Sequence, residues 1–557
     1  MKSKYEVAIV GSGFAGSLLA RILTRLGYDV ILLERGSHPR FAIGESSTPL
    51  ANLSLERIGL RYGLDDCYAL ATHGRWLKKF PQLRRGLKRG FTFYRHHPGA
   101  EFEDRGFESE RLLVAASPDD AIADSHWFRA DVDHHFVRQA VAAGVAYLDN
   151  VDLTASDFTS DGVRLPCSRR GQKVELEASF VIDASGPGGF LARQLAIPSG
   201  LERTRTRSAL VFSHFDNVSL MQDALPSLPT GPYSEDWAAV HHLIDEGWMY
   251  SLRFDHGTTS AGFLLKRAAL KSLHSGTSPP DADSLWQALL SRYPTIAKLF
   301  AGAKPTMPIA FRPLIQHRLT KSAGDRWLLM PHAFAFVDPL FSTGISWSLR
   351  AVERIALMFE EAARSSRVPS TNELRRYSNV LSAEADQIDL LVAGAYKAMT
   401  HFDVFSAQAM LYFAAVSFAE ASQRLQADDS VAWRGFLGIG DPVLESLPRE
   451  ALARLDQMLG RRGAAPGVEE RLGFVRWINE STAPRNVAGL GDSKYRNLYP
   501  VDFDALVDAH CLLGMSREEL VAALPALRGS PSPRLALAEE AGQAASFARQ
   551  GATRAPH

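Results

Sequence analysis

The sequence predicts an α/β protein: a Rossmann-type dinucleotide-binding domain with an interleaved β-sheet layer and a helical C-terminal region. Three observations predict this fold. Residues 7–16 read VAIVGSGFAG, an apolar run that ends in a glycine turn and leads into helically spaced apolar residues. Residues 205–265 alternate between apolar and polar side chains, as strands in a second layer do. From Glu373 onward the pattern is helical and rich in Ala and Leu.

Composition limits the classes of function. The chain has 557 residues, too many for one hydrophobic core, so two or three structural units are expected. Lys plus Arg and Asp plus Glu are both 62, which gives no field to attract nucleic acid or an anionic membrane. The three cysteines lie far apart without metal-ligand spacing, which favours a reduced, cytoplasmic setting. No uninterrupted apolar run reaches 18 residues, so no transmembrane helix is expected.

The opening segment is a candidate dinucleotide-binding βαβ unit. Gly11 permits a tight turn, Gly13 lets the backbone approach a pyrophosphate, and Gly16 allows close packing of helix on strand. The second apolar run, DVILLE, ends in Glu34, about 20 residues after the glycines, where a carboxylate can accept hydrogen bonds from ribose hydroxyls. The alternative is a plain glycine turn, but the strand, helix and acid supply the required context. The candidate residues are Gly11, Gly13, Phe14, Ala15, Gly16, Glu34 and Arg35.

The middle of the chain alternates between helical and strand patterns. A helix is expected at about 50–62, a strand at 90–95, a helix at 126–144, short strands over 145–184, and a buried strand at 327–330. The basic segment 73–90 has the composition of a solvated loop. FVIDASG at 180–186 ends a strand in Asp183 and a turn at Gly186. Asp338 similarly ends a strand just before the helix that begins at Gly344.

These patterns divide the chain into three parts. Residues 1–365 form the dinucleotide-binding domain, with an interleaved substrate-binding sheet drawn from about 85–110 and 205–312. Residues 366–527 form the helical C-terminal region. Residues 528–557 contain few large apolar side chains and are expected to be disordered.

Three segments together resemble the FAD-binding domain of flavoprotein monooxygenases related to p-hydroxybenzoate hydroxylase. They are the opening βαβ unit, FVIDASG, and GDRWLLMPHAFAFVDPLFSTGI at 324–345. The resemblance implies that Asp338 contacts the ribityl or pyrophosphate part of FAD. It also implies that the helix N-terminus at Gly344 and Ile345 faces the flavin and stabilises negative charge there.

Within that superfamily the chain resembles the flavin-dependent halogenases, nearest in type to the phloroglucinol and tetracycline halogenases. HPRFAIGESSTP is similar to the family's G-E-[SA]-x-x-P loop beside the flavin, WFRAD to its F-R-x-D, and HHLIDEGWMY to its HHxxxxGW segment. DPLFSTGI matches the loop that binds halide near the flavin. The resemblance adds as FAD-binding residues Gly44, Glu45, Ser46, Ser47, Arg129, Asp183 and Gly186, and as halide-binding residues Ser342, Thr343 and Gly344.

Lys88, in LKRGFTF, stands where the phloroglucinol enzyme has its catalytic lysine. The resemblance implies that reduced FAD and O2 form a flavin hydroperoxide and that halide converts it to hypohalous acid. An amine can then hold the electrophile, as a haloamine or by a hydrogen bond, and aim it at an aromatic carbon. Lysine suits this role because burial can lower its pKa toward neutrality. The alternative is that Lys88 is another surface cation of the basic segment.

The sequence departs from the family in its candidate substrate pocket. Where the family has W-x-W-x-I-P, this chain keeps Trp248, has Tyr250 for the second Trp, and lacks the proline. In the family this motif is thought to suppress oxygenation. Phe341 replaces the Glu that precedes Ser-Thr-Gly in tryptophan halogenases, so free tryptophan is not the expected substrate.

The leading hypothesis is an FADH2- and O2-dependent halogenase of an electron-rich phenolic or pyrrolic aromatic, free or tethered to a carrier protein. Because no second G-x-G-x-x-G stands in a βαβ context, a separate flavin reductase is the expected source of FADH2. One alternative is a flavin monooxygenase or oxidase on the halogenase scaffold that does not halogenate. Another is a non-catalytic flavoprotein.

Overall fold

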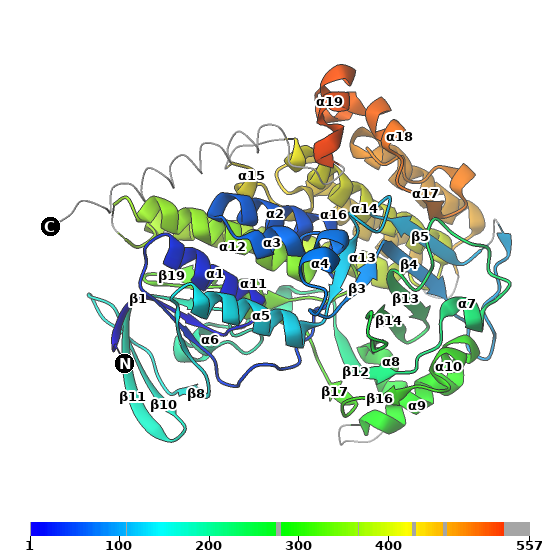
Figure 1. The fold of residues 1–557 in the computed structure, drawn as a ribbon. Helices are drawn as coiled ribbons and strands as arrows, with labels where there is room; N and C mark the ends of the chain where they lie inside the picture. The colour runs from blue at the N-terminus through cyan, green and yellow to red at the C-terminus, as the bar shows by residue number, and fades with distance from the viewer. Residues whose placement is uncertain are drawn as a thin grey trace.

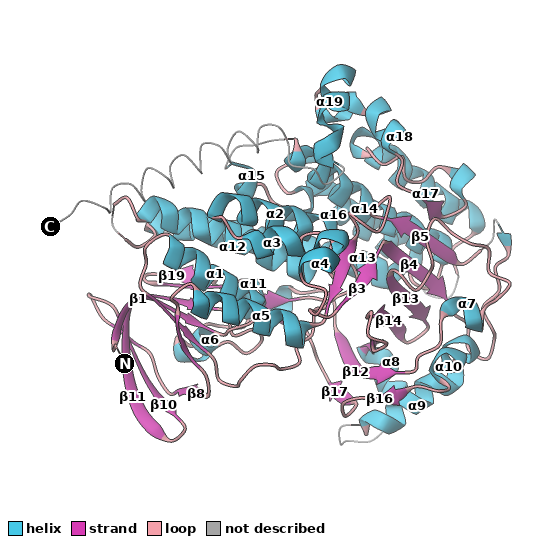
Figure 2. Cartoon of the chain, in the orientation of Figure 1, coloured by secondary structure: helices cyan, strands magenta, loops and turns pink. Residues whose placement is uncertain are grey.

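The computed structural model describes residues 2–527, except 107–108, 274–279, 366, 426–429 and 461–464. Two nine-stranded sheets lie side by side, and helices from both halves of the chain pack around and between them (Figures 1 and 2). The predicted α/β class is therefore confirmed. The predicted disordered tail, 528–557, lies outside the described residues.

The first sheet is the dinucleotide-binding one. Its path runs β19-β20-β11-β1-β2-β7, and the central pairs around β1 are parallel. Five of its strands are β1 (Lys4–Val10), β2 (Val30–Leu33), β7 (Ala146–Leu148), β11 (Gln172–Asp183) and β20 (Trp327–Leu329). Both faces of β1 and β2 are covered, which explains why their sequences are near-continuous apolar runs. Off this path, β8 (Val151–Leu153), β9 (Asp157–Phe158) and β10 (Val163–Arg169) form an antiparallel extension.

Three helices pack together beside this sheet: the first contacts β1 and β2, and the other two pack against the first. They are α1 (Phe14–Arg25), α5 (Arg129–Ala142) and α12 (Thr343–Ala362). A Cβ on Gly16 would lie 2.2 Å from the Gly11 carbonyl oxygen, so α1 can follow β1 this closely only with glycine there. The helix predicted at 126–144 begins later, at Arg129, because Asp124–Trp127 is strand β6.

The second sheet is antiparallel except where β13 pairs with β4 and β22 pairs with β5. Its path runs β16-β12-β15-β14-β13-β4-β5-β22. The strands are β4 (Gly90–Arg95), β5 (Arg111–Ala115), β12 (Ser208–Asp216), β13 (Ala239–Ile244), β14 (Gly247–Arg253), β15 (Thr259–Lys266), β16 (Lys304–Pro305), β17 (Ala310–Arg312) and β22 (Leu498–Tyr499). Because β22 lies in the predicted helical region, the C-terminal part of the chain completes the edge of this sheet. Helices α9 (Ala282–Arg292) and α10 (Pro294–Phe300) cover its outer face (Figure 1).

The basic segment 73–90 is not a solvated loop. It forms α4 (His73–Lys79) and β3 (Arg85–Lys88), and β3 pairs with β6 in a separate two-stranded sheet. Lys78 and Lys79 are exposed, whereas Lys88 is fully buried. A Cβ on Gly86 would lie 2.0 Å from the Arg253 carbonyl oxygen, so β3 is pressed against the end of β14. The prediction was wrong because local charge does not reveal which side of a strand is covered.

Helices form the third layer. Helix α2 (Pro49–Tyr62) packs against α12 and against α3 (Asp65–Leu70). The C-terminal region adds α13 (Thr371–Ala398), α14 (Phe402–Arg424), α16 (Pro442–Leu459), α17 (Val468–Thr482), α18 (Phe503–Asp508) and α19 (Arg517–Leu527). Among the described residues, α14 alone is long and apolar enough to cross a membrane. Its apolar window is 78% buried inside the protein, as in a core helix.

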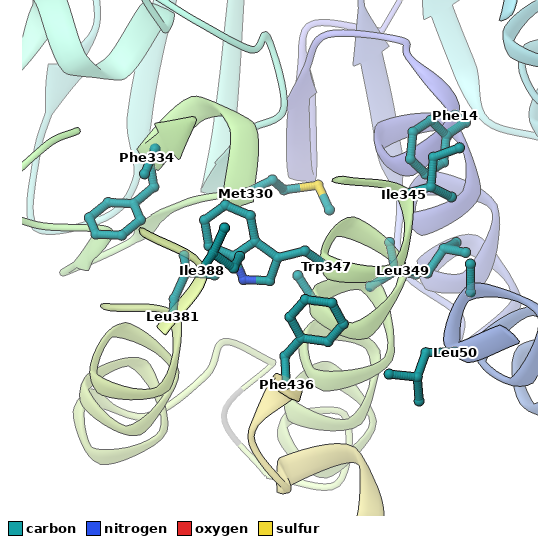
Figure 3. Packing of buried hydrophobic residues seen from close by; sticks show 14 of the residues in the cluster. Phe14, Leu50, Met330, Phe334, Ile345, Trp347, Leu349, Leu381, Ile388 and Phe436 are labelled. Atoms are coloured by element: carbon teal, nitrogen blue, oxygen red, sulfur yellow. The ribbon is translucent and has the colours of Figure 1, made fainter. Parts of the chain in front are cut away.

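Helix α12 joins the first sheet to the C-terminal helices. Figure 3 shows Trp347 of α12 between Met330 and Ile388, with Phe436 beside it. At the same contact Glu384 of α13 accepts hydrogen bonds from the Trp347 indole, at 2.9 Å, and from the Arg354 guanidinium, at 2.6 and 2.8 Å. Neither charged side chain is exposed to water, so each charge is stabilised by the other.

We expect Glu384→Ala to destabilise the protein by about 3–5 kcal/mol, because it leaves a guanidinium buried without its counter-ion. Denaturant unfolding followed by circular dichroism measures the change. The control is Glu361→Ala, which removes an exposed partner of Arg364 and should cost less than about 1 kcal/mol. Equal effects of the two substitutions would contradict this account of the α12–α13 contact.

Candidate active site

The glycine turn leaves space beside the N-terminus of α1. A Cβ on Gly13 would meet no atom closer than 3.7 Å, although its neighbours in the turn are tightly packed. The Phe14 N–H donates to Asp133 at 3.3 Å, and Asp133 forms an ion pair with Arg129. The Arg129 Nη1 donates to the carbonyl oxygens of Ile43 and Gly44. Arg129 therefore ties the 44–48 loop to the first turn of α1.

Glu34 lies at the end of β2, facing this turn. It accepts from the Ser12 N–H at 3.0 Å, the Ser12 hydroxyl at 2.8 Å and the Gly36 N–H at 3.0 Å, and it pairs with Arg40. Burial opposes ionisation, but Arg40 and these hydrogen bonds outweigh it and hold the pKa of Glu34 at about 2. The carboxylate is therefore charged and can accept hydrogen bonds from hydroxyl groups. Its neighbour Arg35 points to solvent.

Asp183 and Asp338 are both buried, and their carboxylate oxygens accept hydrogen bonds from other residues of the chain. Asp183 accepts from the Ser185 N–H and hydroxyl and from the Leu191 N–H, which shapes the turn carrying Gly186. Asp338 accepts from the Leu340 N–H and from two hydroxyls, those of Ser208 and Tyr396. Burial raises the pKa of Asp338 to about 7. Direct contact of either acid with FAD stays a prediction.

The N-terminus of α12 meets the 44–48 loop. Ser342 has a left-handed backbone, with φ of 53°, and its hydroxyl donates to the Ser46 hydroxyl at 3.0 Å. Thr343, Gly344 and Ile345 then open a 20-residue helix, whose N-terminal N–H groups and dipole favour an anion. His332, which the sequence reading did not single out, lies against this turn, because a Cβ on Gly344 would be 3.0 Å from its ring. The predicted halide residues and the Ser46 loop are thus brought together.

Glu45 and Ser47 anchor the loop on its other side. Glu45 contacts His214 of β12 at 3.1 Å. The Ser47 N–H and hydroxyl both donate to the Ser125 carbonyl of β6, at 3.2 and 2.9 Å. The loop is therefore held against the small β3–β6 sheet.

Lys88 ends strand β3 directly behind this loop. Its amine donates to the Ser47 carbonyl oxygen and lies 4.0 Å from the centre of the Phe91 ring. Burial lowers the pKa of Lys88 to about 8, although the carboxylate of Asp124 works in the opposite direction. The alternative of an exposed surface cation is excluded, since the side chain is 0% exposed.

Phe91 also lines a cavity of about 160 Å³. An engineered cavity of about 150 Å³ in another protein binds benzene, so this volume suits one aromatic ring. Two regions of the chain line it. Residues of the first half are Thr48, Pro49, Asn52, Phe91, Val114 and Asp124 among others, and residues of the helical region include Tyr412, Phe413, Glu420, Arg424, Val487, Tyr499 and Phe503.

The residues predicted for the substrate pocket lie elsewhere. Phe341 does not line the cavity, but its ring stacks on that of Tyr412, which does, with centroids 4.4 Å apart. Trp248 is fully buried in β14 and donates to the Tyr396 hydroxyl at 2.9 Å. Tyr250, two residues on, is also absent from the cavity lining. Trp248 thus lies beside Asp338 through their shared contact with Tyr396.

Sequence reasoning missed Asp124 and the lining residues of 487–506. Asp124 stands five residues before Arg129 of WFRAD, but nothing in its local sequence marks it as a site residue. Nothing local distinguishes Val487 or Phe503 from ordinary core residues, because their position depends on how the C-terminal region folds back.

The residues around the glycine turn fit FAD. The space at Gly13 suits a pyrophosphate, and Glu34 is an ionised acceptor for ribose hydroxyls. Three buried polar atoms have no hydrogen-bond partner within the described part of the chain: His38 Nδ1, Arg40 Nε and the Tyr147 hydroxyl. Two of these residues lie close to Glu34, so a bound dinucleotide could supply their missing partners.

Comparison with known proteins agrees with this fit. Residues 6–332 match the family model described as FAD dependent oxidoreductase. The chain is 26% identical to tetracycline 7-halogenase of Kitasatospora aureofaciens, over 72% of this chain and 71% of that one. It is 26% identical to monodechloroaminopyrrolnitrin halogenase of Pseudomonas fluorescens, over 72% of this chain and 70% of that one.

A solved structure is also similar over most of the chain. The crystal structure of halogenase PltM in complex with phloroglucinol and FAD superposes with a TM-score of 0.80 at 25% identity. The match covers 89% of this chain and 99% of that chain. The resemblance to flavin-dependent halogenases that the motifs indicated is therefore confirmed.

We expect Gly13→Val to abolish FAD binding in a folded protein, because a branched side chain would fill the space beside the N-terminus of α1. Flavin absorbance after gel filtration measures binding, and circular dichroism checks folding. The control is Gly473→Val, where a new Cβ meets open space in α17. Unchanged flavin affinity in the Gly13 variant would refute this assignment of the turn.

Proposed function

The chain belongs to the FAD dependent oxidoreductase family, and from this we propose that it halogenates an electron-rich phenolic or pyrrolic aromatic, using FADH2, O2 and halide. One observation carries the proposal. A buried lysine, Lys88, contacts both the loop at the predicted flavin site and Phe91, which lines a cavity of aromatic size.

The order of groups suggests the path of the halogen. The Ser342–Gly344 turn contacts the 46–48 loop, the Lys88 amine contacts the same loop, and Phe91 contacts the amine and lines the cavity. When bound and reduced, FAD supplies with O2 and halide an electrophilic halogen as hypohalous acid. Halide is held by the helix N-terminus at Ser342–Gly344, as its dipole favours. Lys88 then holds the hypohalous acid by a hydrogen bond and directs it to the ring.

Lys88 suits this task because of its surroundings. With a pKa of about 8 the amine carries a proton at neutral pH yet can give it up to a departing hydroxide. Its fixed position between Ser47 and Phe91 limits release of the oxidant to solvent.

The relatives support an aromatic substrate. PltM was solved with phloroglucinol, a phenol, and the tetracycline and pyrrolnitrin enzymes are named as halogenases. One further relative, at 24% identity, is named as a chlorinase of a pyrrole on a peptidyl-carrier protein. The substrate is therefore a small aromatic, free or tethered to a carrier protein. We also propose a separate flavin reductase as the source of FADH2, in the cytoplasm.

A second candidate function is oxygenation of the same ring. It is favoured by the changed motif on β14, where Tyr250 replaces a Trp and the proline is lost. Incubation with a flavin reductase, FAD, NADH, O2 and bromide over a panel of phenols and pyrroles separates the two. Halogenation gives a bromide-dependent product mass, whereas oxygenation gives a product without halide. No FADH2-dependent turnover at all would favour a non-catalytic flavoprotein.

We expect Lys88→Ala to remove halogenation, by about 100-fold or more, while FAD binding and FADH2 oxidation continue. Lys88→Arg should also fail, because a guanidinium does not release its proton at neutral pH. Product formation by mass spectrometry and oxygen consumption measure the two activities separately.

The matched controls are Lys78→Ala and Lys79→Ala, two exposed lysines of the same basic segment, which should keep most activity. Halogenation at the wild-type rate by Lys88→Ala would show that another group delivers the electrophile.

A further inference from the structure

We propose that Asp124 binds the hydroxyl group of a phenolic substrate and takes its proton during ring substitution, which makes it a second catalytic residue. This inference rests on the proposed function and narrows the substrate class to phenols over pyrroles. The argument comes from the position of Asp124 opposite Lys88, from an unpartnered carboxylate oxygen, and from the shape of the cavity.

Asp124 and Lys88 are direct neighbours across two paired strands. In the antiparallel β3–β6 pair, Lys88 is in register with Asp124, and both side chains are buried. Within the described residues they nevertheless form no ion pair, since the amine donates to the Ser47 carbonyl instead. Two opposite charges are thus placed beside one aromatic cavity and kept apart, which is costly unless each has a use.

The carboxylate of Asp124 has one oxygen free. Its Oδ1 accepts from the Asn52 amide at 2.8 Å. Its Oδ2 is buried without a hydrogen-bond partner in the described part of the chain, and Asp124 lines the cavity. A buried acceptor without a donor costs free energy, so a ligand that brings a donor to this oxygen is favoured.

The cavity presents that oxygen to a planar ring. Phe91 and Phe413 meet edge to face with centroids 5.2 Å apart, and both line the space. The other charged residues of the wall already have partners: Arg424 pairs with both Glu420 and Glu56, and the exposed Asp502 accepts hydrogen bonds from the first N–H groups of α18. A ring that enters the cavity beside these aromatic side chains therefore finds, at Asp124 Oδ2, a buried acceptor without a donor.

The ionisation of Asp124 suits proton transfer. Burial raises the pKa of Asp124 to about 7, and the nearby charge of Glu420 adds to this, whereas Lys88, Arg424 and the Asn52 hydrogen bond oppose it. A base with a pKa near neutrality both accepts and returns a proton readily. The rate of halogenation should therefore increase as the pH rises through about 7, because Asp124 becomes ionised and can accept a proton.

The step balances with hypohalous acid as the oxidant. Asp124 takes the hydroxyl proton, and the electron pair of that O–H bond flows into the ring as the new carbon–halogen bond forms. The oxygen–halogen bond breaks, and the departing hydroxide takes a proton from the Lys88 ammonium to leave as water. The resulting neutral amine accepts the ring hydrogen as a proton, and Asp124 returns its proton to the substrate oxygen. Halogenated phenol and water are the products, and both side chains regain their starting states.

The test is Asp124→Asn assayed with phenols of graded acidity, from phenol to fluorinated phenols that are ionised at neutral pH. We expect the variant to lose at least 30-fold in kcat with ordinary phenols and to recover to within about threefold with those already ionised. The wild-type limb of the pH profile near 7 should disappear in the variant. A loss that is equal for all phenols would overturn the role, because a merely structural defect would not depend on substrate acidity.

The control is Asp120→Asn, an acid four residues away whose side chain is 54% exposed and pairs with Arg89. It should behave as wild type with every phenol. If it shows the same dependence on acidity as Asp124→Asn, the assignment to Asp124 is wrong.

Binding gives a readout that does not depend on halogenation. Calorimetry of the FAD-loaded protein should show phenol binding about tenfold tighter than its methyl ether, and Asp124→Val should remove that preference. Equal affinity of the wild type for phenol and ether would overturn the inference. If the preference is present but bromide gives no halogenated product, the proposed halogenation fails while the hydroxyl site at Asp124 stands.

Discussion

The structure depends on placing one ammonium group where water cannot reach it. Lys88 is fully buried on a short strand, with a carbonyl oxygen, an aromatic face and a carboxylate as its surroundings. Each neighbour offsets part of the lost hydration without neutralising the amine completely. The result is a lysine with a pKa of about 8 that lies between an anion-attracting helix N-terminus and a ring-sized cavity.

That placement requires both sheets and the helical region at once. The first sheet orients the glycine turn, Glu34 and the N-terminus of α12. The second sheet supplies Phe91, and the small β3–β6 pair between them holds Lys88. Helix α14 and residues 487–506 then close the cavity from the other side. The C-terminal region therefore helps to line the cavity, although the match to the family model covers only residues 6–332.

Much of this could be predicted from local sequence, and the exceptions have physical reasons. The glycine turn, Glu34, Arg129 and the Ser342 turn are recognisable because short motifs impose their backbone geometry, and the structure brings them together. The burial of Lys88 could not be read from a basic segment, since it depends on β3 packing against β14. Trp248 and Tyr250, which were predicted for the substrate pocket, do not line this cavity, because a motif does not tell which face of its strand meets a cavity. Asp124 became visible only when the β3–β6 register placed it opposite Lys88.

The fate of molecular oxygen tests the central claim most directly. The protein, a flavin reductase, FAD, NADH and a phenol would be incubated with bromide under ¹⁸O2, and the product analysed by mass spectrometry. If Lys88 delivers hypohalous acid, the product carries bromine and no ¹⁸O, because both labelled oxygen atoms leave as water. A product that carries ¹⁸O and forms without bromide would contradict the account and make the protein an oxygenase.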